Sequence, residues 1–429
     1  SSGIMSRVDH DNGEVETLEG PDQGDAVQAV GDHLVIGTYS GAGFYAGQMD
    51  QEWEWETNPE HLFSIGREAG QDRVSDIVDA DGLAAAATIP NYGELGGALV
   101  LFDPAGGDPQ IHRHVVEDHS VVSLAYQDGV IYGGTSIHGG IDSTPADGPA
   151  ELFIWDVQAQ ERIDSVVADE SADIIHTLTF DDQGRLWGMT DSGTMFEFDT
   201  ETREVQNSVS TGLANSNIWG RTSEMAPNPI DGLIYGNAAS RIFTFDPESH
   251  DFTILDSESV RYSTVHEDGT FYFTDRTNVY SFFPEAGAAC DETITGSHNG
   301  GLVIDTGTVC IEDADVRGAV DVGAQASVVM TDSAVRGPVT ATGAERVQIS
   351  GNDLRGPVRL EGTATAVQVD ANEIRGPLAV NDSPTQTAAV ISDNLIRGPL
   401  QCTGNLIDPV NEEASNTIHG RAGGQCAGL

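Results

Sequence analysis

Apolar and polar residues alternate with a period of two along most of residues 1–285, which is the spacing of β-strands with one buried face. Helical spacing is nearly absent there, and turn signals such as DGV, DQG, DSG and EDG separate the alternating runs. One strand ending recurs, an apolar or aromatic run that closes on Asp: LVLFD at 99–103, LFIWD at 152–156, MFEFD at 195–199 and IFTFD at 242–246. These endings lie roughly 40 to 50 residues apart, which is the length of a four-stranded propeller blade.

A second recurrent strand precedes such endings and closes on Gly: HLVIGT at 33–38, VIYGGT at 130–135, RLWGMT at 185–190 and LIYGNA at 233–238. A more apolar strand, such as VVSLAY at 121–126, comes before it. We therefore expect each blade to run from this inner strand through the Gly-ended and Asp-ended strands to an outer strand. The predicted fold of residues 1–285 is an all-β propeller with six or seven blades.

The segment around Ile4 to Leu18 has the pattern of only the second half of a blade. Because a propeller protects its strand edges by closing its ring, we expect the missing inner strands to lie upstream in a longer precursor. A six-bladed ring that is closed by the N-terminal strands is the alternative.

Residues 286–429 carry a shorter repeat: DVRGAV at 315–320, AVRGPV at 334–339, DLRGPV at 353–358, EIRGPL at 373–378 and LIRGPL at 395–400. Its Arg residues are 19, 19, 20 and 22 positions apart. Each unit contains two alternating apolar runs, for example Val358 and Leu360 followed by Val367 and Val369, as one coil of a parallel β-helix does. The second domain is therefore predicted to be a short right-handed parallel β-helix with coils of about 20 residues.

Such a repeat places like residues in columns. We expect Asn352, Asn372 and Asn394 to stack near one turn, and a second column to contain Arg317, Arg336, Arg355, Arg375 and Arg397. Like charges about 5 Å apart repel one another unless carboxylates lie between them, which Asp315, Asp353 and Glu373 allow. We interpret the Arg column as a structural ladder. The alternative is a guanidinium stripe that grips an acidic polysaccharide or an acidic cell surface.

All four Cys lie in the second domain, and none has the spacing of a metal ligand. An even number of Cys at the two ends of a solenoid in a secreted chain predicts two disulfides, Cys290–Cys310 and Cys402–Cys426. Each closes a loop of about 20 residues, worth roughly 3 kcal/mol in the chain-entropy model. They are expected to seal the first and last coils, where a solenoid otherwise exposes strand edges.

The charge of the chain indicates adaptation to salt. There are 69 Asp and Glu against 19 basic residues, all of them Arg, for a net charge of −50. Self-repulsion at this charge destabilises a compact fold at low salt, whereas molar salt shortens the screening length to roughly 3 Å. We predict a halophilic, haloarchaeal protein that works outside the cell or at its surface.

The same composition excludes two classes of partner. Nucleic acid binding needs basic groups that this chain lacks, and membrane insertion needs a run of about 18 apolar residues that the sequence does not contain. No nucleic acid and no membrane insertion are therefore expected.

The residues from Cys290 to Leu429, with RGPV-type coils and the closing NTIHGRAGGQCAGL, resemble β-helical accessory modules of secreted actinobacterial and haloarchaeal carbohydrate-active proteins. In residues 131–156, the stretches IYGGTSIHGG and AELFIWD are similar to propeller repeats of secreted polysaccharide-degrading proteins, including polysaccharide lyases. The first resemblance implies an accessory module and the second a glycan-related propeller. Neither implies a catalytic residue.

Long loops between the second and third strands of neighbouring blades mark the candidate site. They are TIPNYGELGGA at 88–98 and TSIHGGIDSTPADGPA at 135–150, with TYSGAG at 38–43 beside them. These loops offer Tyr39, Asn91, Tyr92, Glu94, His138 and Asp142. The inner strands add His176, Arg221, Arg261 and Tyr262, which we expect to approach the axial channel.

β-Elimination of an acidic glycan needs a His or Tyr base and an Arg that neutralises the uronate carboxylate. His138 and Tyr92 are the candidate bases, and Arg221 and Arg261 the candidate carboxylate partners; Tyr39, Asn91, Glu94, Asp142 and His176 are candidate ligand-binding residues. Simpler interpretations stay open, since His138 lies in a glycine-rich loop and Tyr92 suits a sugar-stacking platform.

For His176 the simpler interpretation is a hydrogen-bonded core residue in an apolar strand. The cluster of His112, His114 and His119 is a weak candidate for metal binding, because the first two border an outer strand where exposed His is common. We predict no metal site and no cofactor.

Three functions remain open from the sequence. The first is a carbohydrate- or surface-binding part of a secreted glycan-processing protein, with a polysaccharide or cell-surface glycan as partner. The second is a polysaccharide lyase that acts on acidic glycans at the propeller face. The third is a surface filament or virus fibre, although disulfide-sealed solenoid ends argue against end-to-end stacking.

Overall fold

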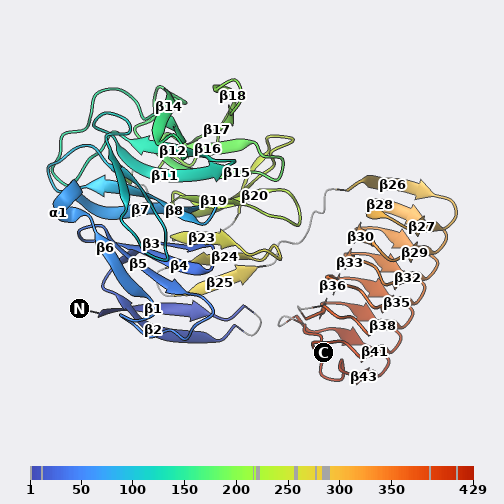
Figure 1. Cartoon of the computed structure of the whole chain (residues 1–429). Coiled ribbons are helices and arrows are strands. Elements are labelled where there is room, and N and C mark those ends of the chain that lie inside the picture. Colours follow the sequence, from blue (N-terminus) through green and yellow to red (C-terminus); the bar gives the residue numbers. More distant parts are fainter. Residues whose placement is uncertain are drawn as a thin grey trace. The chain divides into compact units, whose positions relative to one another are not determined.

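The computed structural model describes residues 2–10, 13–215, 217–218, 223–255, 259–275, 278–282, 290–385, 388–411 and 414–429. The chain divides into two compact units, Ser1–Pro284 and Glu285–Leu429 (Figure 1). Both units are built from β-strands, and the described residues contain one helix, α1 (Gly66–Ala69). Nowhere in these described ranges is there a helix with the length and apolar character needed to cross a membrane.

The first unit is a six-bladed propeller over the described residues, with five four-stranded antiparallel blades and a sixth that has three described strands. The first two blades contain β3 (Gly24–Val30), β4 (His33–Thr38), β5 (Gly43–Gln48) and β6 (Glu60–Ser64), then β7 (Gln71–Ala80), β8 (Leu83–Pro90), β9 (Ala98–Phe102) and β10 (Gln110–Arg113). The third and fourth contain β11 (Ser120–Gln127), β12 (Val130–Ser136), β13 (Leu152–Asp156) and β14 (Glu161–Val166), then β15 (Ile175–Phe180), β16 (Leu186–Thr190), β17 (Thr194–Asp199) and β18 (Glu204–Ser210). The last two contain β19 (Glu224–Pro227), β20 (Ile234–Ala238), β21 (Arg241–Phe245) and β22 (Phe252–Ile254), then β23 (Tyr262–Val265), β24 (Phe271–Thr274) and β25 (Val279–Phe282).

The inner strands stand side by side around the propeller axis, each of β3, β7, β11, β15, β19 and β23 next to the following one (Figure 1). Serine side chains in the middle of two inner strands bond to the beginning of the next inner strand. Ser75 Oγ donates a hydrogen bond to Val121 O at 2.8 Å, and Ser123 Oγ donates to Ile175 O at 2.8 Å. The predicted order of inner, Gly-ended, Asp-ended and outer strand is confirmed in the blades from β11 to β22.

Packing explains why glycine recurs in the second strand of these blades. Gly133 pairs with Phe153 and Gly188 with Phe196 on the next strand. A Cβ on either glycine would collide with the ring of its Phe partner, and both rings are fully buried. The glycine therefore makes room for the aromatic residue of the Asp-ended strand, which fills the space between blades.

The Asp that closes the third strand is a turn residue. Asp156 Oδ1 accepts the backbone N–H of Ala159 at 2.8 Å, and Asp199 Oδ1 accepts those of Glu201 and Thr202 at 2.9 and 2.8 Å. The backbone hydrogen bond from Thr202 is the main cause that lowers the pKa of Asp199. These contacts fix the tight turn into the outer strand, so the repeated Asp is structural.

The predicted half-blade near the N-terminus is a separate two-stranded sheet of β1 (Ser2–Val8) and β2 (Val15–Pro21). Among the described strands, β1 pairs with β2 and does not join β23–β25. The count of six blades is confirmed, and the described N-terminal strands form a sheet of their own; that the missing inner strands of the half-blade lie upstream stays a prediction.

The second unit is a parallel β-solenoid of about seven turns. One sheet runs through β27 (Leu302–Ile304), β29 (Val320–Val322), β32 (Val339–Thr342), β35 (Val358–Glu361), β38 (Leu378–Asn381), β41 (Leu400–Thr403) and β43 (Ala422–Gly424). The other contains β26 (Glu292–His298), β28 (Gly307–Val316), β30 (Ala326–Thr331), β31 (Ala334–Val335), β33 (Arg346–Ser350), β34 (Asp353–Leu354), β36 (Ala366–Asp370), β37 (Glu373–Ile374), β39 (Val390–Ser392), β40 (Leu395–Ile396) and β42 (Thr417–Ile418). Small and β-branched side chains from both sheets fill its core.

The two columns predicted for the solenoid are present. Asn352 Nδ2 donates to Asn372 Oδ1 at 3.0 Å, Asn372 Nδ2 to Asn394 Oδ1 at 3.0 Å, and Asn394 Nδ2 to Asn416 Oδ1 at 2.9 Å. The side-chain amides of Asn352, Asn372 and Asn394 are nearly fully buried and cannot bond to water. The hydrogen bonds along the column satisfy these amides instead.

The Arg column is interleaved with carboxylates. Arg336 Nη2 lies 2.8 Å from Asp315 Oδ2, Arg375 Nη2 lies 3.3 Å from Asp353 Oδ1, and Arg397 Nη2 lies 2.8 Å from Glu373 Oε1. Arg317 and Arg355 contact Asp315 and Asp353 at 4.0 and 3.4 Å. Hydrogen bonds from Arg336 and Arg397 lower the carboxyl pKa of Asp315 and of Glu373, respectively. The contacts are those of a structural ladder, in which exposed pairs each stabilise little.

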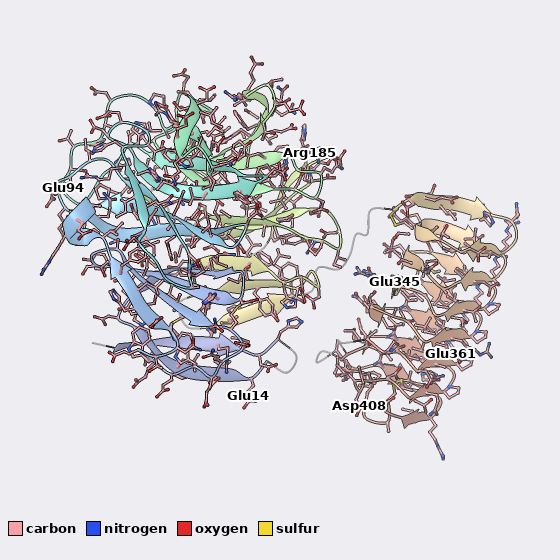
Figure 2. The ribbon with its side chains drawn as sticks, viewed as in Figure 1. Glu14, Glu94, Arg185, Glu345, Glu361 and Asp408 are labelled. Atoms are coloured by element: carbon pink, nitrogen blue, oxygen red, sulfur yellow. A yellow bond between two sulfur atoms is a disulfide. The ribbon has the colours of Figure 1, made fainter. Side chains whose placement is uncertain are left out.

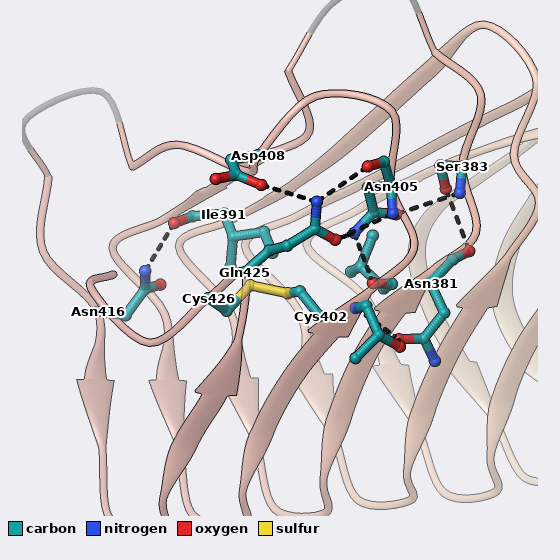
Figure 3. Close-up of a disulfide and its surroundings, with 11 residues drawn as sticks. Asn381, Ser383, Ile391, Cys402, Asn405, Asp408, Asn416, Gln425 and Cys426 are labelled. Atoms are coloured by element: carbon teal, nitrogen blue, oxygen red, sulfur yellow. Dashed lines mark hydrogen bonds between the residues drawn. A yellow bond between two sulfur atoms is a disulfide. The ribbon is translucent and has the colours of Figure 1, made fainter.

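Both predicted disulfides are present, Cys290–Cys310 and Cys402–Cys426. Figure 3 shows the second, beside a polar network that covers the last coil. Gln425 Nε2 donates to Asp408 Oδ1 at 2.7 Å and to Asn405 O at 2.9 Å, and Gln425 Oε1 accepts Asn405 N–H at 2.9 Å. The network satisfies polar groups at the end of the solenoid.

Exposed carboxylates stand on both units (Figure 2), for example Glu14 and Glu94 on the propeller and Glu345, Glu361 and Asp408 on the solenoid.

Candidate functional site

The candidate residues on the loops lie at one end of the propeller, where the inner strands begin and the second strands end. We call this end the loop face; it carries the loops at 39–42, 91–97 and 137–151. Ser120, the first residue of β11, donates its Oγ to His138 O at 2.7 Å, which holds the third of these loops to an inner strand.

Two loops of neighbouring blades are packed into one unit. Gly93 N donates to Ile141 O at 2.7 Å, and Gly140 N donates to Glu94 O at 3.0 Å. A Cβ on Gly140 would collide with Asn91 O, so the glycines around His138 serve close packing of the two loops. The loop that carries Tyr92 is therefore supported along its length by the loop that carries His138.

Tyr92 begins a chain of contacts that leads toward the propeller axis. Its side chain is 53% exposed, and its hydroxyl lies 2.9 Å from that of Tyr39. The guanidinium of Arg73 lies over the Tyr39 ring, 4.7 Å from the centroid. Arg73 Nη1 in turn lies 3.7 Å from Asp25 Oδ2 at the start of β3. The exposed ring thus has a hydrogen-bonded and stacked support behind it.

The same hydrogen bond decides what Tyr39 can do chemically. Its contact with Tyr92 is the main cause that raises the pKa of the Tyr39 hydroxyl above its ordinary value of 10.0. A tyrosine that acts as a base needs the opposite shift, because only the phenolate accepts a proton. Tyr39 is therefore a neutral hydrogen-bonding group near pH 7.

His138 lies apart from Tyr92 in its described contacts. Its ring is 19% exposed, and its Nε2 lies 3.8 Å from Asp173 Oδ2. The backbone N–H of His138 donates to Ser136 Oγ at 3.1 Å. The two candidate bases are thus held by different neighbours on the same pair of loops.

The remaining loop candidates have mixed roles. Asn91 is half-buried and donates Nδ2 to Gly66 O at 3.4 Å, so it ties the loop to α1. Glu94 and Asp142 are exposed, and Figure 2 shows Glu94 at the edge of the propeller beside α1. These two residues contribute negative charge to the loop face.

The inner-strand candidates are not brought together. His176 is 3% exposed with Nε2 3.5 Å from Asn215 O, which fits the interpretation as a core residue. Arg261 is exposed directly before β23, and its backbone O accepts Asn237 Nδ2 at 3.3 Å. Tyr262 lines the axial channel. Arg221 lies outside the described residues.

An axial channel of about 550 Å³ is lined by residues of all six inner strands. Its lining contains three carboxylates, Asp25, Asp76 and Glu224, and no basic side chain among the described residues. Asp76 Oδ2 accepts Leu124 N–H at 2.7 Å, and Glu224 Oε2 accepts Ser263 N–H at 3.0 Å, so both also join neighbouring inner strands. A channel with this lining attracts cations and repels anions.

These three acids were not among the predicted site residues, although the sequence contains a signal for them. Asp25, Asp76 and Glu224 each follow a small residue and precede an apolar one, as GDA, SDI and SEM, the first and third at the start of an inner strand and the second in the middle of one. Arg73 and its ring contact with Tyr39 had no signal, because the contact depends on how two blades meet.

The three His residues weighed as a metal cluster have separate partners. The His112 ring packs on Trp155 at 4.5 Å between centroids, and His119 Nδ1 lies 2.9 Å from Thr135 Oγ1. His114 Nδ1 is 3.9 Å from Asp118 Oδ1. Burial lowers the pKa of both His112 and His119.

The fold and the loop face define the class of this chain: an all-β protein that joins a six-bladed propeller to a parallel β-solenoid. No family model and no curated protein match the sequence. Among solved structures, a chain of one titled "Crystal Structure of Mitotic Checkpoint Complex" is similar over 65% of this chain and 81% of that chain, with 14% identity and a TM-score of 0.48. At this identity and TM-score the likeness carries no argument about function.

Proposed function

We propose that the loop face binds carbohydrate, as the recognition part of a secreted, salt-adapted protein that processes glycans. The observation that carries the proposal is Tyr92, whose ring is 53% exposed and whose loop is braced by Tyr39 and by the loop at 137–151. An aromatic ring that is already ordered stacks on the apolar face of a sugar at little entropic cost.

The charges on the loop face and in the axial channel favour neutral sugars over uronates. Asp25, Asp76 and Glu224 line the channel, Glu94 and Asp142 are exposed on the loops, and the guanidinium of Arg73 is already placed over Tyr39 near Asp25. An anionic glycan would approach several carboxylates for each available guanidinium. A neutral polysaccharide or cell-surface glycan meets no such repulsion.

The remaining features agree with an extracellular setting. Two disulfides and the lack of a membrane-spanning helix in the described residues are compatible with an extracellular protein. We propose that the net charge of −50 reflects a high-salt environment and that the solenoid serves as a spacer or surface anchor. The filament alternative has no specific support among the described contacts.

The polysaccharide-lyase alternative would place the chemistry on the same loops. It needs a base beside an Arg that holds the substrate carboxylate, and the described contacts join neither His138 nor Tyr92 to Arg261. Carbohydrate recognition therefore remains the proposed function, and the binding experiment includes a test for β-elimination.

The test measures binding of the full chain to a panel of neutral and uronate-containing polysaccharides in multimolar NaCl. We expect binding to a neutral member, a loss of at least tenfold in Tyr92→Ala, and no change in Trp55→Ala. Trp55 is a half-buried aromatic residue in the loop at 49–59, which follows β5 at the opposite end of the propeller. Binding that Tyr92→Ala leaves intact would refute the proposal. An increase in absorbance near 235 nm with a uronate substrate would instead establish the lyase.

A further inference from the structure

A second cavity lies away from the loops described above, between the end of β1 and the last blade. Its volume is about 410 Å³, and its lining includes Val8, His10, Tyr262, His266 and Tyr272. It brings together residues that are more than 250 positions apart, because His10 Nδ1 lies 2.5 Å from Tyr272 Oη with a sequence separation of 262. No sequence motif marks His10, His266 or Tyr272.

The two imidazoles that line this cavity, those of His10 and His266, both contact one carboxylate, that of Asp268. His10 Nε2 lies 3.0 Å from Asp268 Oδ2, and His266 Nδ1 lies 2.9 Å from Asp268 Oδ1. The rings of His10 and His266 are stacked, with centroids 3.9 Å apart and an interplanar angle of 18°. One ligand atom from each of the three residues lies within 4.8 Å of the others.

We propose that His10, His266 and Asp268 form a binding site for a transition-metal ion, Zn²⁺ in particular, where the N-terminal sheet meets the last blade. Two imidazole nitrogens and one carboxylate oxygen suit Zn²⁺, Ni²⁺ or Cu²⁺, whereas Ca²⁺ and Mg²⁺ prefer sites made of oxygen atoms. Three protein ligands leave a fourth position for water or for a ligand in the adjacent cavity.

Neighbouring groups hold the donors in place, as outer-shell partners do in metal sites. Tyr272 Oη, at 2.5 Å from Nδ1, fixes the orientation of the His10 ring and leaves Nε2 directed at Asp268. The backbone N–H of Thr270 donates to Asp268 Oδ1 at 2.8 Å.

The three side chains are also accessible to an ion, since about a third of each is exposed (30% for His10, 36% for His266 and 32% for Asp268). Because the three residues come from the N-terminal segment and from the last blade, a bound ion would also affect the stability of the fold. Among the described strands, β1 pairs with β2 and with no strand of the last blade. A metal bound by His10 and His266 would cross-link this sheet to the last blade, so binding stabilises the folded propeller by mass action.

The test is a calorimetric titration of the full chain with ZnCl₂ after treatment with a chelator, with thermal unfolding followed by Trp fluorescence. We expect one high-affinity site per chain and a rise in melting temperature of about 5 °C when Zn²⁺ reaches roughly 100 times its dissociation constant. His10→Ala and Asp268→Asn should both remove the high-affinity site. His61→Ala is the matched control, because His61 lies in β6 with Nε2 2.9 Å from Ser64 Oγ.

Weak binding of Zn²⁺ to the many surface carboxylates is a background that all variants share. The proposal is overturned if His10→Ala binds Zn²⁺ as the unmodified chain does, or if Ca²⁺ displaces Zn²⁺ at equal concentration. Co²⁺ provides a second readout that is independent of stability. A visible absorption band typical of Co²⁺ with nitrogen ligands should be present in the unmodified chain and in His61→Ala, and should be absent in His10→Ala.

Discussion

Replacement of Asn372 by Ala tests whether the buried hydrogen bonds of the Asn column stabilise the solenoid. The Asn372 side chain is 2% exposed and donates Nδ2 to Ile349 O at 2.7 Å, to Asp370 O at 2.7 Å and to Asn394 Oδ1 at 3.0 Å. Its Oδ1 accepts the backbone N–H and the Nδ2–H of Asn352 at 2.9 and 3.0 Å. These five contacts are lost, in which the two hydrogens of Nδ2 are shared among three acceptors, and the partner groups on Ile349, Asn352 and Asn394 remain buried. At about 1 kcal/mol for each bond, we expect the free energy of unfolding to fall by roughly 3–5 kcal/mol.

The two units can be followed separately in this experiment. Residues 285–429 contain no Phe, Trp or Tyr, so Trp fluorescence reports on the propeller, while far-ultraviolet circular dichroism reports on both units. Denaturant unfolding in molar salt should show the dichroism transition of the solenoid at lower denaturant, with the fluorescence transition unchanged.

Asn381→Ala is the control for the Asn372 experiment. Asn381 is only half-buried, and its Oδ1 accepts hydrogen bonds from Thr403 N and Oγ1 at 3.1 and 2.9 Å. We expect a loss of about 1 kcal/mol. A loss below 1 kcal/mol for Asn372→Ala, or a loss equal to that of the control, would show that the buried hydrogen bonds of the Asn column do not stabilise the solenoid.

Two further predictions concern the propeller. Gly188→Ala places a Cβ against the ring of Phe196 and the side chain of Leu178, and should lower the free energy of unfolding by about 1–3 kcal/mol in the fluorescence transition; an unchanged midpoint would contradict the packing cause of the Gly-ended strand. Burial raises the pKa of the Asp169 carboxyl group, but hydrogen bonds from Ser192 and Ser171 outweigh this effect and lower the pKa from 3.8 to about 2. Because the folded-state pKa is the lower one, the carboxylate stabilises the fold above pH 4 and loses this effect as the pH falls toward 2. The shift corresponds to about 2 kcal/mol, which solvent screening reduces to about 1 kcal/mol for this partly exposed group. The stability difference between the unmodified chain and Asp169→Asn should therefore shrink between pH 4 and pH 2, and a constant difference would count against this assignment.

The fold could be predicted from the sequence because each repeat lies within a short stretch of the chain. The aromatic run before Asp156 and the Gly at 133 belong to neighbouring strands of one blade, so a pattern of about 25 residues contains both halves of the contact. The Arg spacings of 19 to 22 equal the register of the coils, as in Val316↔Val335 and Ile374↔Ile396. Side chains that repeat with the coil must stack, and the columns followed from that rule.

The candidate site could be predicted from the sequence only in part. That Tyr92 and His138 share one face follows from their places after the second strands of adjacent blades. The pairing of Tyr92 with Tyr39 and the contact of Arg73 with the Tyr39 ring depend on loop geometry that has no period. The meeting of His10 with Tyr272 joins segments 262 positions apart, and neither segment carries a metal-binding motif.

The central claim is that the loop face recognises neutral carbohydrate through Tyr92. The most direct measurement is a calorimetric titration of the full chain with two oligosaccharides of a bound glycan that differ only in oxidation of the C6 hydroxymethyl group to a carboxylate. We expect the neutral oligosaccharide to bind at least tenfold more tightly than the oxidised one, this difference to narrow as NaCl rises through the molar range, and Tyr92→Ala to weaken binding of the neutral oligosaccharide at least tenfold. Tighter binding of the uronate form would contradict the account.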